Sequence, residues 1–229
     1  QLGLRADVML ADLGFSSNQM AEPGRGFSFS ANGPLDMRLN PESPITAAEL
    51  VNTLTERELS GMLSEFGEEP HARSIARNLV RRRADGPILT TSQFASIVRD
   101  AVPARERFGG GIDPATRSFQ ALRIAVNDEL GSLAALLTSI QQSARRIAAG
   151  EPAFLRPGAR VGIISFHSLE DRPVKQSFAS LVEKGLAQHV TRKAVQAGEA
   201  EIASNPRSRS AKFRVIRIGQ NSASASHRD

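Results

Sequence analysis

Two short apolar runs, each ending at the start of a polar loop, constrain the fold of this chain more than any other feature. Residues 7–12 (DVMLAD) end in an acid shortly before a glycine, and residues 160–165 (RVGIIS) end shortly before His167. Apolar runs of this length are typical of parallel strands that are buried on both faces. Ligands of open α/β sheets bind beyond the carboxyl ends of such strands. The two runs therefore predict a sheet with a ligand site near residues 12–14 and 165–167.

Helical patterns dominate the chain between these two strands. Residues 46–49 (TAAE) and 55–58 (TERE) have the spacing of capping boxes, in which two side chains satisfy free amides of the first helical turn. Further helical patterns cover residues 68–83 and a stretch that begins with a cap at Thr91. Because no strand interrupts these helices, they predict an α-helical lobe over about residues 40–104.

The remainder of the chain has the pattern of the second half of an α/β sheet. Apolar residues at helical spacing predict a long helix over residues 114–149, with a break near Gly131. Another helix is expected to begin with a cap at Ser168, and residues 190–195 and 212–218 are expected to form an antiparallel strand pair. The order of elements predicts an α/β core that is interrupted by a helical insertion.

The composition excludes several classes of protein. The chain contains no cysteine, so disulfide scaffolds, cysteine-bound zinc and thiol catalysis are excluded. No apolar run approaches the roughly 20 residues that a membrane-spanning helix needs. The first five residues also lack the apolar core of a signal peptide. We therefore expect a soluble, cytoplasmic protein without a membrane partner.

Basic side chains gather in two clusters, on a chain whose formal net charge is +5. In the first cluster arginines recur at every fourth residue, as on one face of a helix, and the second lies in an acid-free stretch over residues 205–217. Two such clusters suit a phosphate backbone, although two solvated faces would give the same pattern. The residues that we expect to contact such a backbone are Arg73, Arg77, Arg81, Arg207, Arg209 and Lys212.

Six motifs give the chain a resemblance to a known family. They are residues 12–19 (DLGFSSNQ), 25–29 (RGFSF), 33–38 (GPLDMR), 116–124 (TRSFQALRI, followed by Val126 and Asn127), 164–172 (ISFHSLEDR) and 205–210 (NPRSRS). Together and in this order they resemble the signatures of the MraW/RsmH methyltransferases. The resemblance implies a Rossmann-like methyltransferase core with an inserted α-helical domain. It also implies methylation of cytosine N4 in the decoding region of small-subunit ribosomal RNA, with S-adenosylmethionine (SAM) as cofactor.

The resemblance also implies a division of the chain into parts. We expect a partial methyltransferase core with the cofactor and substrate loop over residues 1–39, and an inserted substrate-recognition domain over residues 40–104. The rest of the core is expected over residues 105–219 and a disordered tail over residues 220–229. The family's first strands and glycine-rich cofactor loop would lie upstream of Asp7. We therefore expect a truncated chain that lacks about 60–90 residues and exposes the apolar edge and face of its first strand.

The resemblance places candidate site residues at the ends of the two apolar runs. It implies that Asp12 and Gln19 contact SAM, although a strand-end carboxylate and an ordinary loop amide are the alternatives. Cytosine N4 needs hydrogen-bond acceptors as it becomes tetrahedral, and from their position we expect the backbone carbonyls of residues 14–17 and the hydroxyl of Ser16 or Ser17 to serve. His167 is a candidate for contact with the target nucleotide or its phosphate. The target is either the ribosomal RNA itself or the assembled small subunit.

Other readings of the same residues are less well supported. Ser165, His167 and Asp171 lie too close together in sequence for a hydrolase triad, and no G-x-S-x-G elbow occurs. The spacing of His167, Glu170 and Asp171 is not diagnostic of a metal, so we expect none. The main rival is a non-catalytic RNA-binding remnant that lacks a complete SAM site. The sequence does not determine the oligomeric state.

A second pair of residues leaves two alternatives open. Asp36 and Arg38 lie in the glycine-rich segment that follows the first apolar run. They either order that loop by pairing with each other or contact RNA directly, and the sequence alone favours neither.

Overall fold

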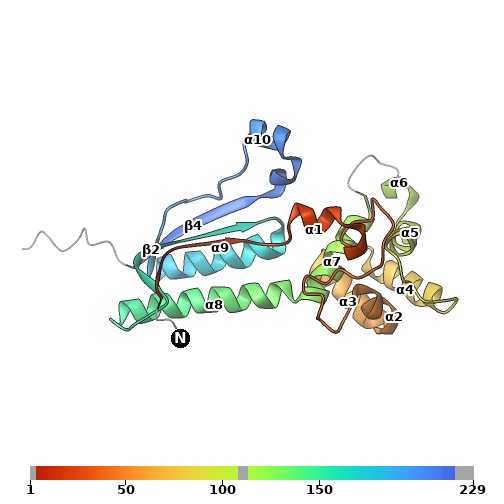
Figure 1. Cartoon of the computed structure of the whole chain (residues 1–229), viewed down its shortest axis with the longest axis horizontal. Coiled ribbons are helices and arrows are strands. Elements are labelled where there is room, and N and C mark those ends of the chain that lie inside the picture. The colour runs from red at the N-terminus through yellow and green to blue at the C-terminus, as the bar shows by residue number, and fades with distance from the viewer. Residues whose placement is uncertain (1–3, 108–112, 220–229) are drawn as a thin grey trace, which may run out of the picture. The chain divides into compact units, whose positions relative to one another are not determined.

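A computed structural model of the chain describes residues 4–107 and 113–219 and divides it into two compact units (Figure 1). The sheet unit comprises Gln1–Gly14 with Leu130–Asp229, and the helical unit comprises Phe15–Glu129. The predicted tail and the glycine run at 109–111 lie outside the described residues. No helix in the described ranges is both long and apolar enough to cross a membrane.

The sheet unit is built on a mixed sheet, which confirms the α/β class. In the described part of the chain its strand order is β1-β2-β4-β3, with β1 parallel to β2 and β4 antiparallel to both of its neighbours. Asp12, at the end of the first strand, pairs with Ile164 near the end of the second. The strands are β1 (Ala6–Asp12), β2 (Leu155–Ser165), β3 (Ala187–His189) and β4 (Lys212–Ile218).

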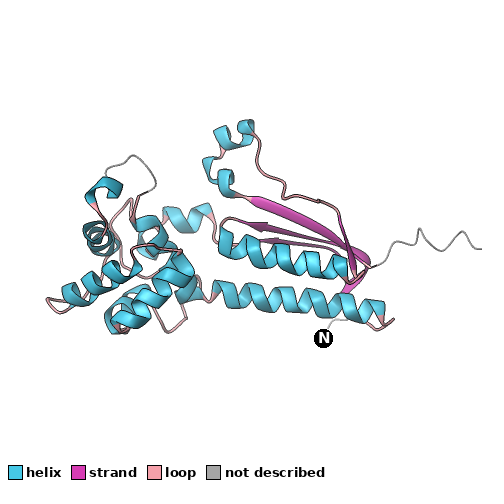
Figure 2. Cartoon of the chain, turned by 180° about the vertical axis from the view of Figure 1, so that it is seen from behind, coloured by secondary structure: helices cyan, strands magenta, loops and turns pink. Residues whose placement is uncertain are grey.

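Two long helices, α8 (Glu129–Ala148) and α9 (Ser168–Glu183), run alongside the strands of this unit (Figure 2). Their apolar stripes share one core with the second strand, in which Ile140, Val161 and Phe178 are almost completely buried. Removal of such side chains from water is the main driving force for packing helices on a sheet. The short helices α10 (Glu199–Ser204) and η2 (Pro206–Ser210) complete the unit.

The first strand packs on the core with one face and exposes the other. Met9 and Ala11 pack against the core, but Val8 and Leu10 are 67% and 62% exposed. Val8 and Leu10 alternate with Met9 and Ala11, so they lie on the opposite face of the strand, and that face is exposed. The parallel pairing of this strand is confirmed, and the expected exposure of its apolar face is observed. The expected exposure of its edge is observed.

The helical unit contains the expected consecutive helices, beginning after a long loop. Capping boxes at Thr46 and Thr55 are confirmed, and both threonine hydroxyls accept an amide of the first turn. The helices of the unit are α1 (Ser17–Ala21), η1 (Pro23–Arg25), α2 (Ala47–Thr53), α3 (Glu56–Gly67), α4 (Ala72–Arg83), α5 (Thr91–Ala101), α6 (Ala104–Arg107) and α7 (Ala115–Asn127).

Three helix boundaries differ from the prediction. The cap of α5 is Thr90, while Thr91 is buried and its hydroxyl donates to the carbonyl of Ala31. The expected break in the long helix is observed, but it lies at Asp128, where φ is +46°, three residues before Gly131. The residue before α9 is His167, whose side chain makes no capping hydrogen bond, so the predicted cap at Ser168 was wrong.

The strand pair near the C-terminus is also shifted. The partner of β4 on this side is the short strand over residues 187–189. Residues 190–195 form no strand, although the Val190 and Thr191 amides donate to the Val215 carbonyl and Val195 forms an isolated bridge with Phe213. The units, moreover, divide after Gly14 and Glu129, whereas the predicted parts divided after residues 39 and 104. The loop before α2 belongs to the helical unit because its apolar side chains, such as Leu35, pack in that core.

Candidate functional site

In the sheet unit, Asp12 stands where the parallel pair of strands ends. The Leu13 amide donates to the Ile164 carbonyl (N–O distance 3.0 Å), and Gly14 then leaves the strand with φ +91°. The Asp12 side chain is exposed and makes no hydrogen bond or ion pair within the described residues. The alternative of a carboxylate satisfied by loop amides is therefore not observed. Asp12 remains a free anionic acceptor.

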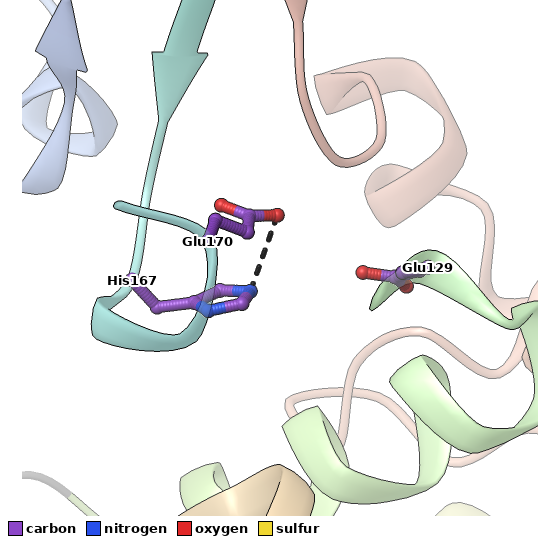
Figure 3. Close-up of side chains that lie close together, drawn as sticks. All are labelled: Glu129, His167 and Glu170. Carbon is purple, nitrogen blue, oxygen red and sulfur yellow. Dashed lines mark ion pairs between the residues drawn. The ribbon is translucent and has the colours of Figure 1, made fainter. Parts of the chain in front are cut away.

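His167 follows the neighbouring strand and lies against Glu170 (Figure 3). The His167 side chain is 13% exposed, and its Nε2 atom lies 3.2 Å from Glu170 Oε1. Within the described chain neither ring nitrogen has hydrogen-bond geometry toward a partner. Glu170 is itself held in place, because its Oε2 accepts the Phe166 amide at 2.8 Å. A protonated imidazole would therefore gain a fixed carboxylate partner, and a neutral imidazole keeps an acceptor nitrogen.

Asp171, in the first turn of α9, has a structural task. Its carboxylate accepts both Nε and one terminal nitrogen of Arg214, at 2.7 and 3.0 Å, and Lys212 Nζ lies 3.5 Å away. The hydrogen bonds from Arg214 hold the pKa of Asp171 below its ordinary value, against the opposing effect of burial. Asp171 thereby ties α9 to β4. It also places Lys212, a candidate for RNA contact, beside an acid.

In the helical unit, Ser16 and Gln19 form a capping box at the start of α1. The Ser16 amide donates to Gln19 Oε1 at 2.8 Å, and the Gln19 amide donates to Ser16 Oγ at 3.3 Å. The capping-box spacing that predicted the helices after Thr46 and Thr55 is also present here as Ser-x-x-Gln, but the sequence analysis did not assign a helix at this position. The capping box occupies the acceptor of Gln19 and leaves its side-chain amino group as a donor. The side chain of Ser17 lies outside the described part of the structure.

The residue before this turn is clamped by an aromatic and an arginine side chain. The Phe15 ring stacks on Phe27, with 5.0 Å between centroids, and the Arg123 guanidinium lies 4.7 Å from the Phe15 ring centre. Arg123 also donates to both carboxylate oxygens of Glu129, at 2.7 and 2.9 Å. Arg123 belongs to the motif over residues 116–124, and its contact with Phe15 fixes the residue that precedes Ser16.

Asn127, at the end of α7, holds the other end of the same loop. Its Oδ1 accepts the Leu39 amide at 2.7 Å, and its Nδ2 donates to the Met37 carbonyl at 2.8 Å. Between these contacts, Arg38 donates Nε and a terminal nitrogen to Asp36, at 2.9 and 2.8 Å. The hydrogen bond from Arg38 lowers the pKa of Asp36. Of the two alternatives for this pair, mutual pairing is the one observed.

The candidate RNA-binding arginines stand on exposed surfaces of both units. On α4, Arg73, Arg77 and Arg81 are exposed, and Arg77 makes only a long ion pair of 3.7 Å with Glu56. On η2 of the sheet unit, Arg207 and Arg209 are exposed as well.

Two arginines that extend the basic clusters in the sequence have structural partners instead. Arg83 donates to the carbonyls of Val51 and Leu54, both at 2.7 Å, and thereby satisfies the C-terminal end of α2. Arg214 is held by Asp171. Proximity in sequence to a basic cluster therefore does not make an arginine available to RNA.

Comparison with known proteins places these residues in a family. The family model described as the MraW methylase family matches residues 3–219. A protein of Acidobacterium capsulatum named "Ribosomal RNA small subunit methyltransferase H" is 50% identical over 209 residues, which cover 91% of this chain and 65% of the relative. Relatives with the same name from Symbiobacterium thermophilum and Syntrophotalea carbinolica are 46% and 47% identical. The match to the Symbiobacterium protein covers 94% of this chain and 69% of the relative, and the match to the Syntrophotalea protein covers 92% and 68%. The chain thus spans about two thirds of the length of these relatives.

Proposed function

The chain belongs to the MraW methylase family, and on this premise we propose that it forms part of an enzyme that methylates small-subunit ribosomal RNA with SAM. More finely, we propose that the methyl group goes to the exocyclic N4 of a cytosine in the decoding region. The observation that carries the proposal is the high identity, 46–50% over more than nine tenths of this chain, to proteins named as small-subunit ribosomal RNA methyltransferases.

The residues that would hold the cofactor fit its chemistry. SAM supplies an electrophilic methyl group on a sulfonium centre and also carries an ammonium group and an adenine amino group. Asp12 offers an exposed carboxylate without a partner in the described residues, and such an acceptor suits cationic and N–H donor groups. Gln19 offers its side-chain amino group as a donor, because its oxygen is engaged by the Ser16 amide.

The acceptor for cytosine N4 is proposed to lie in the turn that begins at Ser16. The lone pair of N4 is delocalised into the ring, so the reaction needs the amino group positioned and its hydrogens accepted as it becomes tetrahedral. The Ser16 hydroxyl already accepts the Gln19 amide at 3.3 Å, but an oxygen has a second lone pair. A Ser16→Ala/Ser17→Ala pair should lower methyl transfer about 10- to 100-fold if a hydroxyl is the acceptor. Unchanged transfer would leave only the backbone carbonyls.

His167 is proposed to contact the target nucleotide or its phosphate. The Glu170 carboxylate, 3.2 Å from its Nε2, would hold the ring in place, and neither ring nitrogen has a hydrogen-bond partner within the described residues. His167→Gln tests this role because glutamine keeps a hydrogen-bonding group without the titratable charge. We expect a raised KM for the RNA substrate and an unchanged affinity for SAM. Loss of SAM binding would instead assign His167 to the cofactor site.

The two exposed basic surfaces are proposed to bind phosphates that flank the target. The target base must leave its stack to reach a methyl donor, and contacts to the neighbouring backbone can hold the RNA while it does so. The surfaces comprise Arg73, Arg77 and Arg81 on α4, and Arg207, Arg209 and Lys212 near η2.

The deciding experiment is transfer of labelled methyl from SAM into unmodified small ribosomal subunits. It compares this chain with a version extended to the length of its relatives, and naked RNA serves as a second substrate. We expect transfer by the extended version. If neither folded version transfers methyl but both bind the RNA, the protein is an RNA-binding module and the enzymatic proposal fails.

A further inference from the structure

A cavity of about 300 Å³ lies within the helical unit. It is lined by the connection between α3 and α4, the residue after α5 and the start of α7. The lining side chains that bear on its chemistry are Glu69, His71, Val102, Asp113 and Arg117. A volume of this size is at the lower end of the range for small-molecule sites.

Two helices pack closely next to the residues that line this cavity. Gly67 ends α3 against α7, and a Cβ atom at Gly67 would lie 2.7 Å from the Arg117 carbonyl oxygen and 3.2 Å from Ala121 Cβ. The chain then turns through Glu68, which has φ +47°, and presents Glu69 beside the first turn of α7. A glycine is therefore required where the cavity begins.

Glu69 is the inner polar group of the cavity. The residue is 6% exposed, and its Oε1 accepts the His71 amide at 2.9 Å. Within the described ranges no ion pair of this carboxylate is observed. A buried carboxylate is costly unless further donors or a cation compensate it, and one amide uses only part of its acceptor capacity. Glu69 thus presents unused acceptor sites to the cavity.

Arg117 supplies a positive charge on the same cavity. It is exposed in the third position of α7 and its side chain makes no hydrogen bond or ion pair in the described part of the chain. Asp113, by contrast, is already satisfied, because Arg99 donates to it at 2.8 Å and the Ala115 amide donates to it at 2.8 Å. The cavity therefore combines a buried acceptor with an uncompensated cation.

We propose that this cavity binds a guanine nucleotide of the substrate RNA, an inference that rests on the proposed function. The Watson–Crick edge of guanine carries two adjacent donors, the N1–H and the 2-amino group, which match the two oxygens of the Glu69 carboxylate. Adenine, cytosine and uracil each present a single donor group at that edge. Arg117 would pair with the nucleotide's phosphate. The cavity would thus recognise an unpaired guanosine that accompanies the methylated cytosine.

Mononucleotide binding to the chain, measured by saturation-transfer NMR and titration calorimetry, tests the chemistry directly. GMP should bind roughly 5- to 100-fold more tightly than AMP, CMP or UMP, as expected for a bidentate contact to a base. IMP, which lacks the 2-amino group, should be weaker than GMP. Equal binding of all five nucleotides would overturn the proposal.

Variants assign the two contacts. Glu69→Gln should abolish the preference for GMP over IMP, and Arg117→Ala should reduce GMP affinity to that of guanosine while leaving guanosine unchanged. Arg57→Ala, on an exposed position of α3 outside the cavity, is the matched control and should change neither. If Glu69→Gln unfolds, Arg117→Ala still tests the site, because Arg117 is exposed. Equal effects of the Arg57 and Arg117 variants would overturn the assignment.

Two further measurements distinguish RNA from a free nucleotide as the ligand, and failure of this inference from failure of the proposed function. A short single-stranded RNA with one guanine should displace GMP better than the same RNA with inosine, and tighter binding of free GTP than of RNA would overturn the RNA assignment. Methyl transfer by the extended protein without guanine binding overturns this inference alone. Guanine binding without methyl transfer overturns the proposed function alone.

Discussion

Replacement of Arg214 by methionine should test whether the contact between α9 and β4 stabilises the sheet unit. Arg214 and Asp171 side chains are 16% and 11% exposed, and their two hydrogen bonds are 2.7 and 3.0 Å long. Loss of one partner of a buried pair typically costs about 3–5 kcal/mol because the other charge stays buried. Lys212 Nζ, 3.5 Å from Asp171, remains as a weaker partner. We therefore expect Arg214→Met to lower the free energy of unfolding by about 2–3 kcal/mol.

Urea unfolding at pH 7, followed by circular dichroism, measures this loss. Arg217→Met is the matched control, because Arg217 lies on the same strand but is exposed, and it should change stability by less than about 0.5 kcal/mol. The double variant Asp171→Asn/Arg214→Met should recover part of the loss, since it leaves no buried charge unpaired and Lys212 is partly exposed to solvent. Equal effects of the Arg214 and Arg217 variants would refute the reasoning, as would a double variant less stable than the sum of its single changes.

The same pair predicts a pH dependence. Hydrogen bonds from Arg214 lower the pKa of Asp171 in the folded protein. A carboxyl with a depressed folded pKa contributes stability that is fully present above its unfolded pKa, about 3.9, and lost as pH falls through the folded value. Below about pH 4, the wild-type chain should therefore lose stability more steeply than Asp171→Asn. Parallel stability curves in this range would contradict the assigned role.

The remaining predictions concern the loop, the basic surface and the exposed strand. Gly26→Ala should destabilise the helical unit by more than about 3 kcal/mol in thermal unfolding, because φ is +71° and the new Cβ would meet the Pro34 carbonyl oxygen. Arg73→Glu/Arg81→Glu should weaken RNA binding and reduce the slope of log K against log salt by about 0.9 per lost phosphate contact, whereas an unchanged slope would identify a merely solvated face. Leu10→Lys, at a position 62% exposed on an edge strand, should reduce light scattering of the concentrated chain without lowering its unfolding temperature.

The comparison of sequence and structure shows which signals are local. Thr46 and Thr55 cap their helices as predicted, because a capping box is formed by residues three positions apart and needs no tertiary partner. The cap of α5 was misplaced by one residue because Thr90 and Thr91 are both threonines. Burial of Thr91 against the loop, through the Gly33 amide and Ala31 carbonyl, distinguishes them only in three dimensions.

The candidate site divides in the same way. The sequence located Asp12 and His167, because an apolar run that ends in polar residues marks the carboxyl end of a strand. It did not reveal that the Gln19 oxygen is engaged by Ser16, nor that Arg83 serves the end of another helix. Those partners depend on where an amide or carbonyl stands in the folded chain.

By itself the sequence determined the α/β class, the parallel pair of strands, most of the helices and the family, since each depends on periodicity or on motifs of adjacent residues. The tertiary structure decided which of these residues are available for chemistry. Glu69 is buried at a cavity that the exposed Arg117 also lines. Arg214 is paired with Asp171, and Leu10 is exposed on an edge strand. Burial and pairing are set by distant segments, through which desolvation and hydrogen bonding act, and no local pattern encodes them.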